Sequence, residues 1–523
     1  MKKIVALILS VLMIFPLAVP AFALGDQITN TPTVYIRGAG RNLYESDDYE
    51  SDDTIIYPFE IDINALVNEH FDPLTKVLME GLLTGNYDNY CDYLYGIIAP
   101  IFEDVVLDEN GEASNGTGDG IKVENIPVAY KTSGFKVMEN DFRFDFRLSP
   151  LEIAKDLKIY IERVYAASGN KKIALVGRCF AGNIVSAYLA EYPEHAKQFV
   201  ESVVMYIPST SGIQMLGALF SGEIVLDPNE VDSFAQYLLE NKDLIEDPTI
   251  NAFVSALVAF LNHVKVLGLG TDAIQNIVEA VKGNLVPRLA LATFGTFPGY
   301  WAMIPTEYYE SAKATIFAGQ EEKYAGLIAK NDEYFNKVQL TYEEDLVNIH
   351  NEGVSVSVIA KYNIPGIPVY EGAKNQSDLM SEATDVSLGA TFAPYGKVLP
   401  QSYIDSLEDT KYVSPDRIVD ASTCLFPDRT WFFKDMSHYD FPDSANALIA
   451  EIINGKGTLT VFSNENYPQY MQYDPATEEV SPILKPVTEK PEEGSNEERF
   501  SIFVRFFTAI INFFTKLFNG ELF

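Results

Sequence analysis

Short apolar runs and segments with helical spacing alternate along the first half of the chain. Residues 33–36, 173–176 and 203–207 are largely apolar runs, which are typical of strands buried on both faces. Residues 149–164 place apolar side chains every three or four positions, and a second helical pattern opens at about Gly182. This order of strand, helix, strand, helix and strand predicts a parallel sheet with helices on both faces.

The helix before residues 173–176 has a clear starting signal. Ser149 is a capping residue, Pro150 stands at the first helical position, and Glu152 follows the cap by three residues. We therefore predict a helix from Ser149 to about Val164, with its apolar face on the sheet. Since such sheets bind ligands at the carboxyl ends of their strands, residues just after the strands are candidates for a site.

The pattern changes in the middle of the chain. Residues 211–350 have long helical stretches and no convincing strands, which predicts an inserted helical cap, or lid. Strand character returns at residues 354–360 and 431–433. We therefore expect a mostly parallel α/β core in two parts, residues 24–210 and 351–466.

Both ends of the chain differ from this core. Residues 1–23 have the positive, apolar and small-residue order of a secretory signal, with cleavage predicted after Ala23, so we expect a secreted protein. Residues 467–498 are rich in Pro and Glu, as in a linker. Residues 499–523 predict an aromatic amphipathic helix that lies on a membrane surface, docks on a partner, or packs on the protein itself.

Composition excludes several classes of function. The chain has 523 residues and a formal net charge of −36, so nucleic acid is not expected as a partner, because phosphate binding needs clustered Lys and Arg. We find no zinc spacing, P-loop or dinucleotide fingerprint and expect no metal and no cofactor. Residues 108–120 resemble a calcium loop only loosely, because Ala113 stands where Gly is needed and Asp119 where Glu is needed. A solvated loop is therefore predicted.

The chain has three cysteines, Cys91, Cys179 and Cys424. An odd number leaves at least one thiol unpaired in an exported monomer, which raises the question of a reactive thiol. The alternative is that all three are small buried apolar residues. Whether Cys91 pairs with Cys424 stays open at this point.

Cys179 lies in a recognisable turn. Gly177 to Gly182 follow an apolar run and precede a helix, and their spacing matches the nucleophile elbow G-x-S-x-G with Cys at the nucleophile and Ala181 at the last position. Small residues are needed because this strained turn brings backbone segments close together. A cysteine at a helix N-terminus beside Arg178 should have a lowered pKa and more of the nucleophilic thiolate.

A nucleophile of this kind needs a base, and the chain offers five histidines. His438 follows a late strand and precedes a helix predicted from about Ser444, which places it in a loop at the sheet edge. Of the other four, His70 belongs to an early helical region, and His195 lies at the far end of the helix after the elbow. His263 and His350 lie in or beside the cap. We therefore predict His438 as the base.

The acid that orients the base should follow a strand between nucleophile and base. Asp378 follows the strand at 354–360 and is our candidate, with Asp420 and Asp385 as rivals. Asp428 is disfavoured, because it begins the strand that ends near His438 and so lies at the opposite edge of the sheet.

Acyl transfer also needs two N–H donors for the oxyanion. The strand at 33–36 runs into the glycine turn that contains Ala39. We predict the backbone N–H groups of Ala39 and of Phe180, just after the nucleophile, as this pair.

These residues occur in blocks that resemble the lecithin:cholesterol acyltransferase-like α/β-hydrolases, a family that includes secreted and lysosomal phospholipid acylhydrolases. The blocks have the family's order and span residues 30 to 455: an oxyanion strand and turn at 34–41, a Y-D-W-R-like block at 144–148, the elbow at 175–182, a cap segment with prolines at 297–305, an acid loop at 375–378, and His438. The chain differs from the family pattern at the elbow, where Cys179 replaces Ser, Arg178 replaces His and Ala181 replaces Gly.

The resemblance implies an α/β-hydrolase fold and acyl transfer from a lipid ester to water or an alcohol, with Cys179, His438 and Asp378 as a triad. It also supports Asp378 over Asp420. Two alternatives remain at this stage. One is an inactive lipid-binding or surface protein that kept the fold, and the other is a hydrolase of small lactones or thioesters.

Overall fold

The computed structural model describes residues 27–483, except for residues 48–50, 52–53, 60–62, 372–374 and most of 226–278. The predicted signal, the C-terminal segment 499–523 and His263 lie outside the described residues. The chain divides into two units, residues 1–484 and 485–523, and every described residue belongs to the first.

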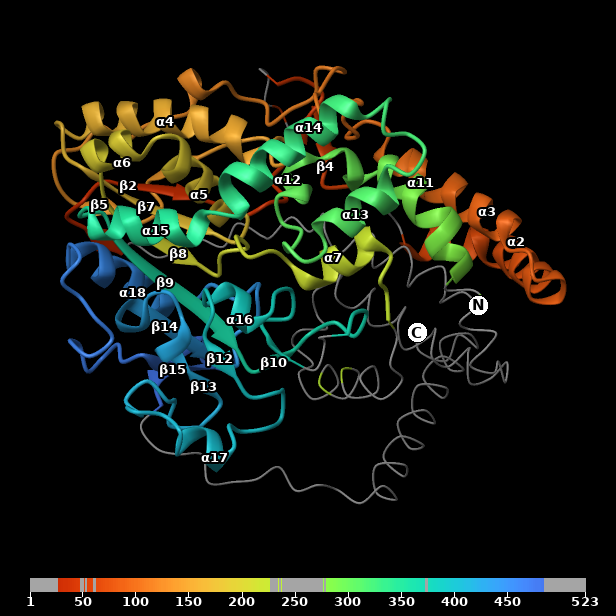
Figure 1. Ribbon diagram of the computed structural model, residues 1–523. Helices are drawn as coiled ribbons and strands as arrows, with labels where there is room; N and C mark the ends of the chain where they lie inside the picture. The colour runs from red at the N-terminus through yellow and green to blue at the C-terminus, as the bar shows by residue number, and fades with distance from the viewer. Residues whose placement is uncertain are drawn as a thin grey trace, which may run out of the picture. The chain divides into compact units, whose positions relative to one another are not determined.

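An eight-stranded sheet lies at the centre of this unit (Figure 1), in the order β16-β15-β14-β9-β8-β7-β2-β6. Neighbouring strands are parallel except for the last pair, β15 and β16, which is antiparallel. The predicted parallel α/β sheet is thus confirmed. Its strands are β2 (Thr33–Ile36), β6 (Asn140–Phe142), β7 (Ile173–Arg178), β8 (Val200–Tyr206), β9 (Ser355–Tyr362), β14 (Thr430–Lys434), β15 (Tyr470–Asp474) and β16 (Glu479–Pro482).

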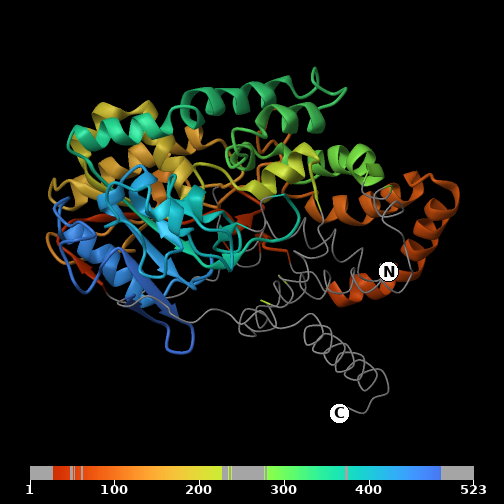
Figure 2. The same cartoon turned by 60° about the horizontal axis from the view of Figure 1, so that its bottom comes forward.

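Helices cover both faces of the sheet, as Figures 1 and 2 show. Successive residues of a strand point to opposite faces, so Leu175 packs in one hydrophobic core while Val176 packs in the other. The first core includes α4 (Pro150–Ala167) and α5 (Ala181–Glu191), and the second includes α18 (Asp443–Asn454). Both strand faces are apolar because neither meets water.

The predicted start of α4 is confirmed. The Ser149 hydroxyl accepts the Leu151 N–H at 3.3 Å, and the Glu152 carboxylate accepts the Ser149 N–H at 3.3 Å, which forms a capping box.

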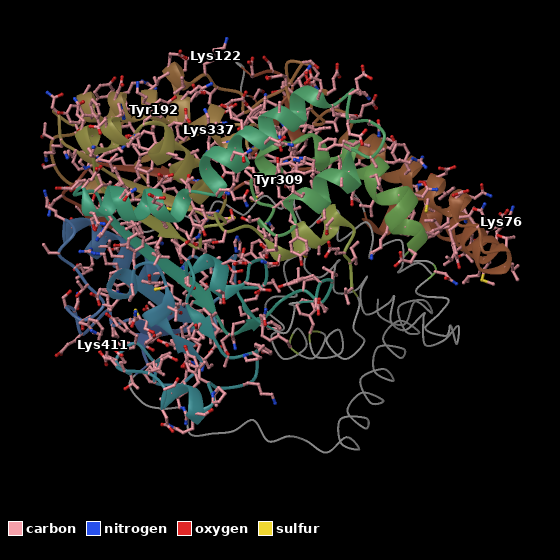
Figure 3. The ribbon with its side chains drawn as sticks, in the orientation of Figure 1. Lys76, Lys122, Tyr192, Tyr309, Lys337 and Lys411 are labelled. Atoms are coloured by element: carbon pink, nitrogen blue, oxygen red, sulfur yellow. The ribbon has the colours of Figure 1, made fainter. Side chains whose placement is uncertain are left out.

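The segment between β8 and β9, predicted as a helical cap, has helices and no strand among its described residues. Tyr309 packs inside it (Figure 3) and stacks on Phe335 with ring centroids 3.9 Å apart. The helices are α7 (Gln214–Ser221), η5 (Val281–Leu285), α11 (Val286–Leu291), η6 (Phe294–Thr296), α12 (Pro298–Trp301), α13 (Tyr309–Ile316), α14 (Ala325–Tyr334), η7 (Phe335–Gln339) and α15 (Tyr342–Asn351).

Smaller elements complete the unit. Four two-stranded sheets pair β1 (Ile28–Thr29) with β5 (Phe135–Lys136), β3 (Leu43–Tyr44) with β4 (Ile55–Tyr57), β10 (Ile364–Pro365) with β11 (Gln376–Ser377), and β12 (Thr391–Phe392) with β13 (Val419–Asp420). The other helices are α2 (Ile63–Thr84), α3 (Asp88–Ile98), η2 (Ala99–Phe102), η3 (Val123–Asn125), α6 (Pro193–Phe199), α16 (Ala383–Val386), α17 (Gln401–Ile404), η8 (Ala421–Thr423) and η9 (Pro427–Arg429). In the described part of the chain, no helix combines the length and the apolar character needed to cross a bilayer.

The structure corrects one predicted boundary. Residues 467–498 were expected to be a linker, but β15 and β16 lie within this range and extend the sheet beyond β14. The two strands carry polar side chains because they form the edge of the sheet, where one face meets water. The second core part, predicted as residues 351–466, therefore continues to the end of β16.

Candidate active site

Cys179 stands in the sharp turn between β7 and α5. Its φ is +54°, in the left-handed region that side chains other than glycine rarely adopt. Its N–H donates to the Tyr206 carbonyl at 3.0 Å, and its carbonyl accepts the Gly182 N–H at 2.8 Å. These bonds hold the strained residue at the carboxyl edge of the sheet, as a nucleophile elbow requires.

The glycines that flank this turn are needed for close packing. A Cβ on Gly182 would lie 2.6 Å from the Cβ of Pro208, and a Cβ on Gly177 would lie 3.1 Å from Val185 Cγ2. The crowding agrees with the expectation from sequence that the elbow needs small residues.

His438 and Asp378 form a close pair beside this turn. Nδ1 of His438 lies 2.7 Å from Oδ2 of Asp378, and the His438 N–H donates to the Asp378 carbonyl at 2.7 Å. The second carboxylate oxygen, Oδ1, accepts the N–H groups of Met380 at 3.1 Å and Ser381 at 2.8 Å. The carboxylate is thus fixed by the backbone and can hold the imidazole in one orientation.

The imidazole of His438 also acts on the Cys179 thiol, since each of the two groups shifts the pKa of the other. Burial tends to raise the pKa of the Cys179 thiol, but the charge of His438, its hydrogen bond and the charge of Arg178 outweigh burial and lower that pKa. Burial tends to lower the pKa of His438, but Asp378 and Cys179 raise it to about 9. Together these directions favour a thiolate beside an imidazolium at neutral pH.

The glycine turn after β2 passes over Cys179. A Cβ on Gly38 would lie 3.1 Å from the Cβ of Cys179 and 3.5 Å from its Sγ. Ala39 is the next residue of this turn, and the backbone N–H of Phe180 is one of the groups that lower the pKa of Cys179. The predicted role of Ala39 and Phe180 as oxyanion donors stays a prediction.

The rival acids are engaged elsewhere. Asp420 accepts the Ser422 N–H at 2.9 Å and the Tyr403 hydroxyl at 3.0 Å. Asp385 accepts a hydrogen bond from Gln214 at 3.4 Å, and Asp428 one from the Tyr412 hydroxyl at 2.6 Å. Of these acids, Asp378 alone hydrogen bonds His438.

The other described histidines also have separate partners. His195 lies between the Tyr188 hydroxyl, at 2.7 Å, and Glu162, at 3.1 Å. His350 accepts the Val356 N–H at 3.1 Å. His70 lies 3.1 Å from the Tyr93 hydroxyl.

Lys361, at the end of β9, is a site residue that the sequence did not indicate. Its ammonium group is fully buried and donates to the carbonyls of Ser437 at 2.8 Å, His438 at 3.4 Å and Asp440 at 2.6 Å. Burial lowers the pKa of Lys361 to about 7. A lysine at the end of an apolar strand was the available signal, because a charge there needs a buried partner.

A group of aromatic side chains packs on the elbow side of α12. Phe146 lies 5.4 Å from Tyr57 and 6.4 Å from Tyr300, between ring centroids. A Cβ on Gly299 of α12 would lie 2.1 Å from the Phe146 carbonyl and 3.1 Å from the Phe180 ring. Burial, followed by the charge of Cys179, raises the pKa of Tyr300. One side of the elbow is therefore apolar.

The remaining cysteines differ from Cys179. All three thiols are free, and Cys91 and Cys424 are buried. Burial raises the pKa of each of these two to about 11. Cys179 is therefore the cysteine whose surroundings favour the thiolate.

The loop at 108–120 is ordered by its own hydrogen bonds and by Arg147. The Asp108 carboxylate accepts the Asn110 N–H at 2.9 Å, while Arg147 donates to the carbonyls of Val105 at 2.9 Å and Thr117 at 3.0 Å. Across the described residues, no three His, Cys, Asp or Glu side chains are grouped so that they could hold a metal ion.

Comparisons of this chain with models of known protein families and with curated proteins give no match in either case.

Proposed function

We propose that the protein is a secreted acyl-ester hydrolase or O-acyltransferase that acts on lipids, with the α/β-hydrolase fold of the lecithin:cholesterol acyltransferase-like family. The observation that carries the proposal is the 2.7 Å bond between His438 and Asp378, with the same imidazole close enough to Cys179 to lower the pKa of its thiol. A nucleophile, a base and an orienting acid in contact are the arrangement used for covalent acyl transfer.

The chemistry begins with attack of the Cys179 thiolate on the ester carbonyl. The negative charge on the tetrahedral oxygen is stabilised by the N–H groups of Ala39 and Phe180. The imidazolium of His438 gives its proton to the leaving alcohol, and a thioester remains on Cys179. His438 then takes a proton from water or an acceptor alcohol, which attacks the thioester and releases the thiolate.

The fold supports this assignment in two ways. The elbow follows a central strand of a mostly parallel sheet, and Asp378 and His438 follow β9 and β14 in the chain order expected of such hydrolases. The helical segment between β8 and β9 packs on the elbow side, since a Cβ on Gly299 of α12 would lie 3.1 Å from Phe180.

A lipid ester is the substrate class that these surroundings favour. Phe146, Tyr300 and Phe180 form an apolar environment near the thiol, and acyl chains gain free energy in proportion to the apolar surface they bury. Contact with a membrane surface through residues 499–523 belongs to the same proposal, and its test is liposome flotation of the full chain against a chain without these residues.

Turnover of a series of phenyl esters with acyl chains from two to sixteen carbons tests the function. We expect kcat/KM to rise with chain length, and mass spectrometry of acid-quenched protein to find the acyl group on Cys179. Cys179→Ala should abolish both signals, whereas Cys424→Ala, which removes a buried thiol outside the site, should keep them. Full esterase activity in Cys179→Ala would refute the proposal.

A further inference from the structure

Arg178, the residue before the candidate nucleophile, is a buried cation without a polar partner. Its side chain is 8% exposed. Among the described residues, its guanidinium group makes no hydrogen bond and has no carboxylate oxygen within 4.0 Å, and its nitrogens are not among the fully buried atoms without a partner, so they still reach solvent. A cation so little exposed and without an anionic partner is unusual, because buried charges are normally paired.

The contact that Arg178 does make leaves its N–H groups unused. The guanidinium carbon lies 4.0 Å from the centre of the Phe441 ring, in a cation–π arrangement. Such stacking uses the flat face of the group, whereas its five N–H donors point outward in the plane. The hydrogen-bonding edge of Arg178 therefore remains available.

A second basic side chain, Lys361, lies on the same aromatic ring. The Lys361 ammonium also lies 4.0 Å from the Phe441 ring centre, and its hydrogen-bond partners are backbone carbonyls. The acid of this loop, Asp440, accepts the Ser437 N–H at 2.8 Å. Since burial lowers the pKa of Lys361 to about 7, this lysine is only partly charged at neutral pH, and Arg178 is the permanent cation of the pair.

The charge of Arg178 acts on the thiol, since it is one of the causes that lower the pKa of Cys179. Arg178 ends β7, Cys179 follows it directly, and Cys179 is partly exposed, so solvent reaches this point. The carboxyl edge of a parallel sheet is also where ligands bind.

We propose that Arg178 binds an anionic group of the substrate, a carboxylate or a phosphate, while Cys179 attacks the acyl carbon. A guanidinium suits either group, because its paired N–H donors match two oxygens of one anion. That the anion belongs to a substrate rests on the proposed function, but the anion site itself can be tested without any turnover.

Alkylation of Cys179 with two reagents tests the site. Iodoacetate and iodoacetamide are close in size and differ in charge, and in both cases the thiolate displaces iodide. We expect the ratio of the iodoacetate rate to the iodoacetamide rate at Cys179 to fall about tenfold in Arg178→Gln, the effect of losing one charge-assisted hydrogen bond. Arg178→Lys should keep part of the ratio, and the Cys91 and Cys424 peptides serve as internal controls. A lower thiolate fraction slows both reagents equally and cancels in the ratio.

The wild-type protein gives an independent measurement if the variants do not fold. Inorganic phosphate or butyrate at millimolar concentration should slow the iodoacetamide labelling of Cys179, while sodium chloride of equal ionic strength should not. No protection, or an unchanged alkylation ratio in Arg178→Gln, would overturn the anion site.

Two matched pairs of esters identify which part of the substrate carries the anion. In the first pair, phenyl hydrogen succinate has a carboxylate on the acyl side and phenyl butyrate has none. In the second pair, the phosphate monoester of 2-hydroxyethyl butyrate has a phosphate on the alcohol side and the unmodified ester has none. We expect kcat/KM to be higher for the anionic ester in one of the two pairs. Arg178→Gln should lose this preference. If alkylation is selective but no ester turns over, the anion site stands and the proposed function fails.

Discussion

The ammonium nitrogen of Lys361 lies 2.8 Å from the carbonyl oxygen of Ser437, the residue before the candidate base. With its further bonds to the carbonyls of His438 and Asp440, Lys361 ties the histidine loop to strand β9. The loop therefore takes its position from the sheet, and the imidazole keeps its alignment with the thiol.

Replacement of Lys361 by Met should disturb this alignment. We expect kcat to fall by about 100-fold, because a misplacement of about 1 Å of a reacting group has effects of this size, while KM changes little. Lys434→Met is the matched control, because Lys434 is a buried lysine on the neighbouring strand β14 and pairs with Asp416 at 3.0 Å. Both variants should lose stability, so a fall in kcat in both would mean that Lys361 has no positioning role.

The pH dependence should follow the thiolate and imidazolium pair. Activity should rise as Cys179 loses its proton, at a pH below the usual range for a thiol, since the pKa of Cys179 is lowered. It should fall as pH increases through about 9, where His438 loses the proton that it gives to the leaving alcohol.

The rate of iodoacetamide labelling against pH checks the acid side of this profile without substrate. Cys179 should label well below the pH at which Cys424 does, because the pKa of Cys424 is raised to about 11. Equal pH profiles for the two thiols would contradict the ion pair.

Removal of the charge on Asp378 should remove the orientation of the base. We expect Asp378→Asn to lower kcat by about 10⁴-fold, as the loss of the acid does in Ser-His-Asp enzymes. Asp420→Asn is the control, because Asp420 is equally buried and bonds Ser422 and Tyr403 instead. A similar loss in both variants would indicate damage to the fold and would argue against a role for Asp378 in catalysis.

The elbow should be sensitive to a single methyl group. In Gly182→Ala the new Cβ meets Pro208 at 2.6 Å, so we expect a loss of about 1–3 kcal/mol in the free energy of unfolding, as for other overpacked sites. The helical Gly96 has open space around its Cβ position, and Gly96→Ala should gain about 0.5–1 kcal/mol. Urea unfolding of both variants measures the contrast.

The sequence predicted the elements that have strong local signals. The helix that begins after Ser149 and the strand at 173–176 could be found because capping residues and continuous apolar runs depend on neighbouring positions alone. The structure also brings Cys179, Asp378 and His438 together, although the choice of Asp378 over Asp420 came from a resemblance rather than from a local pattern.

Other features depend on contacts between distant parts of the chain. Strands β15 and β16 were missed because an edge strand with mixed polar side chains resembles a linker in sequence. The role of Lys361 depends on carbonyls of a loop more than seventy positions away. No periodic pattern encodes such a contact, since the tertiary fold alone creates it.

Strands β8 and β9 are hydrogen-bonded neighbours, although the whole helical segment separates them in the chain. The two strands are parallel, so the chain leaves β8 at the carboxyl edge of the sheet and enters β9 at the opposite edge. The connection has to cross the sheet, but the helices between its two ends can grow, shrink or be exchanged without altering any strand pairing. Cys179 precedes this insertion, and Asp378 and His438 follow it, so the reacting groups and the helices that cover them are encoded in separable stretches. If the proposed function holds, substrate preference can thus diverge in evolution, or be redesigned, while Cys179, Asp378 and His438 stay unchanged.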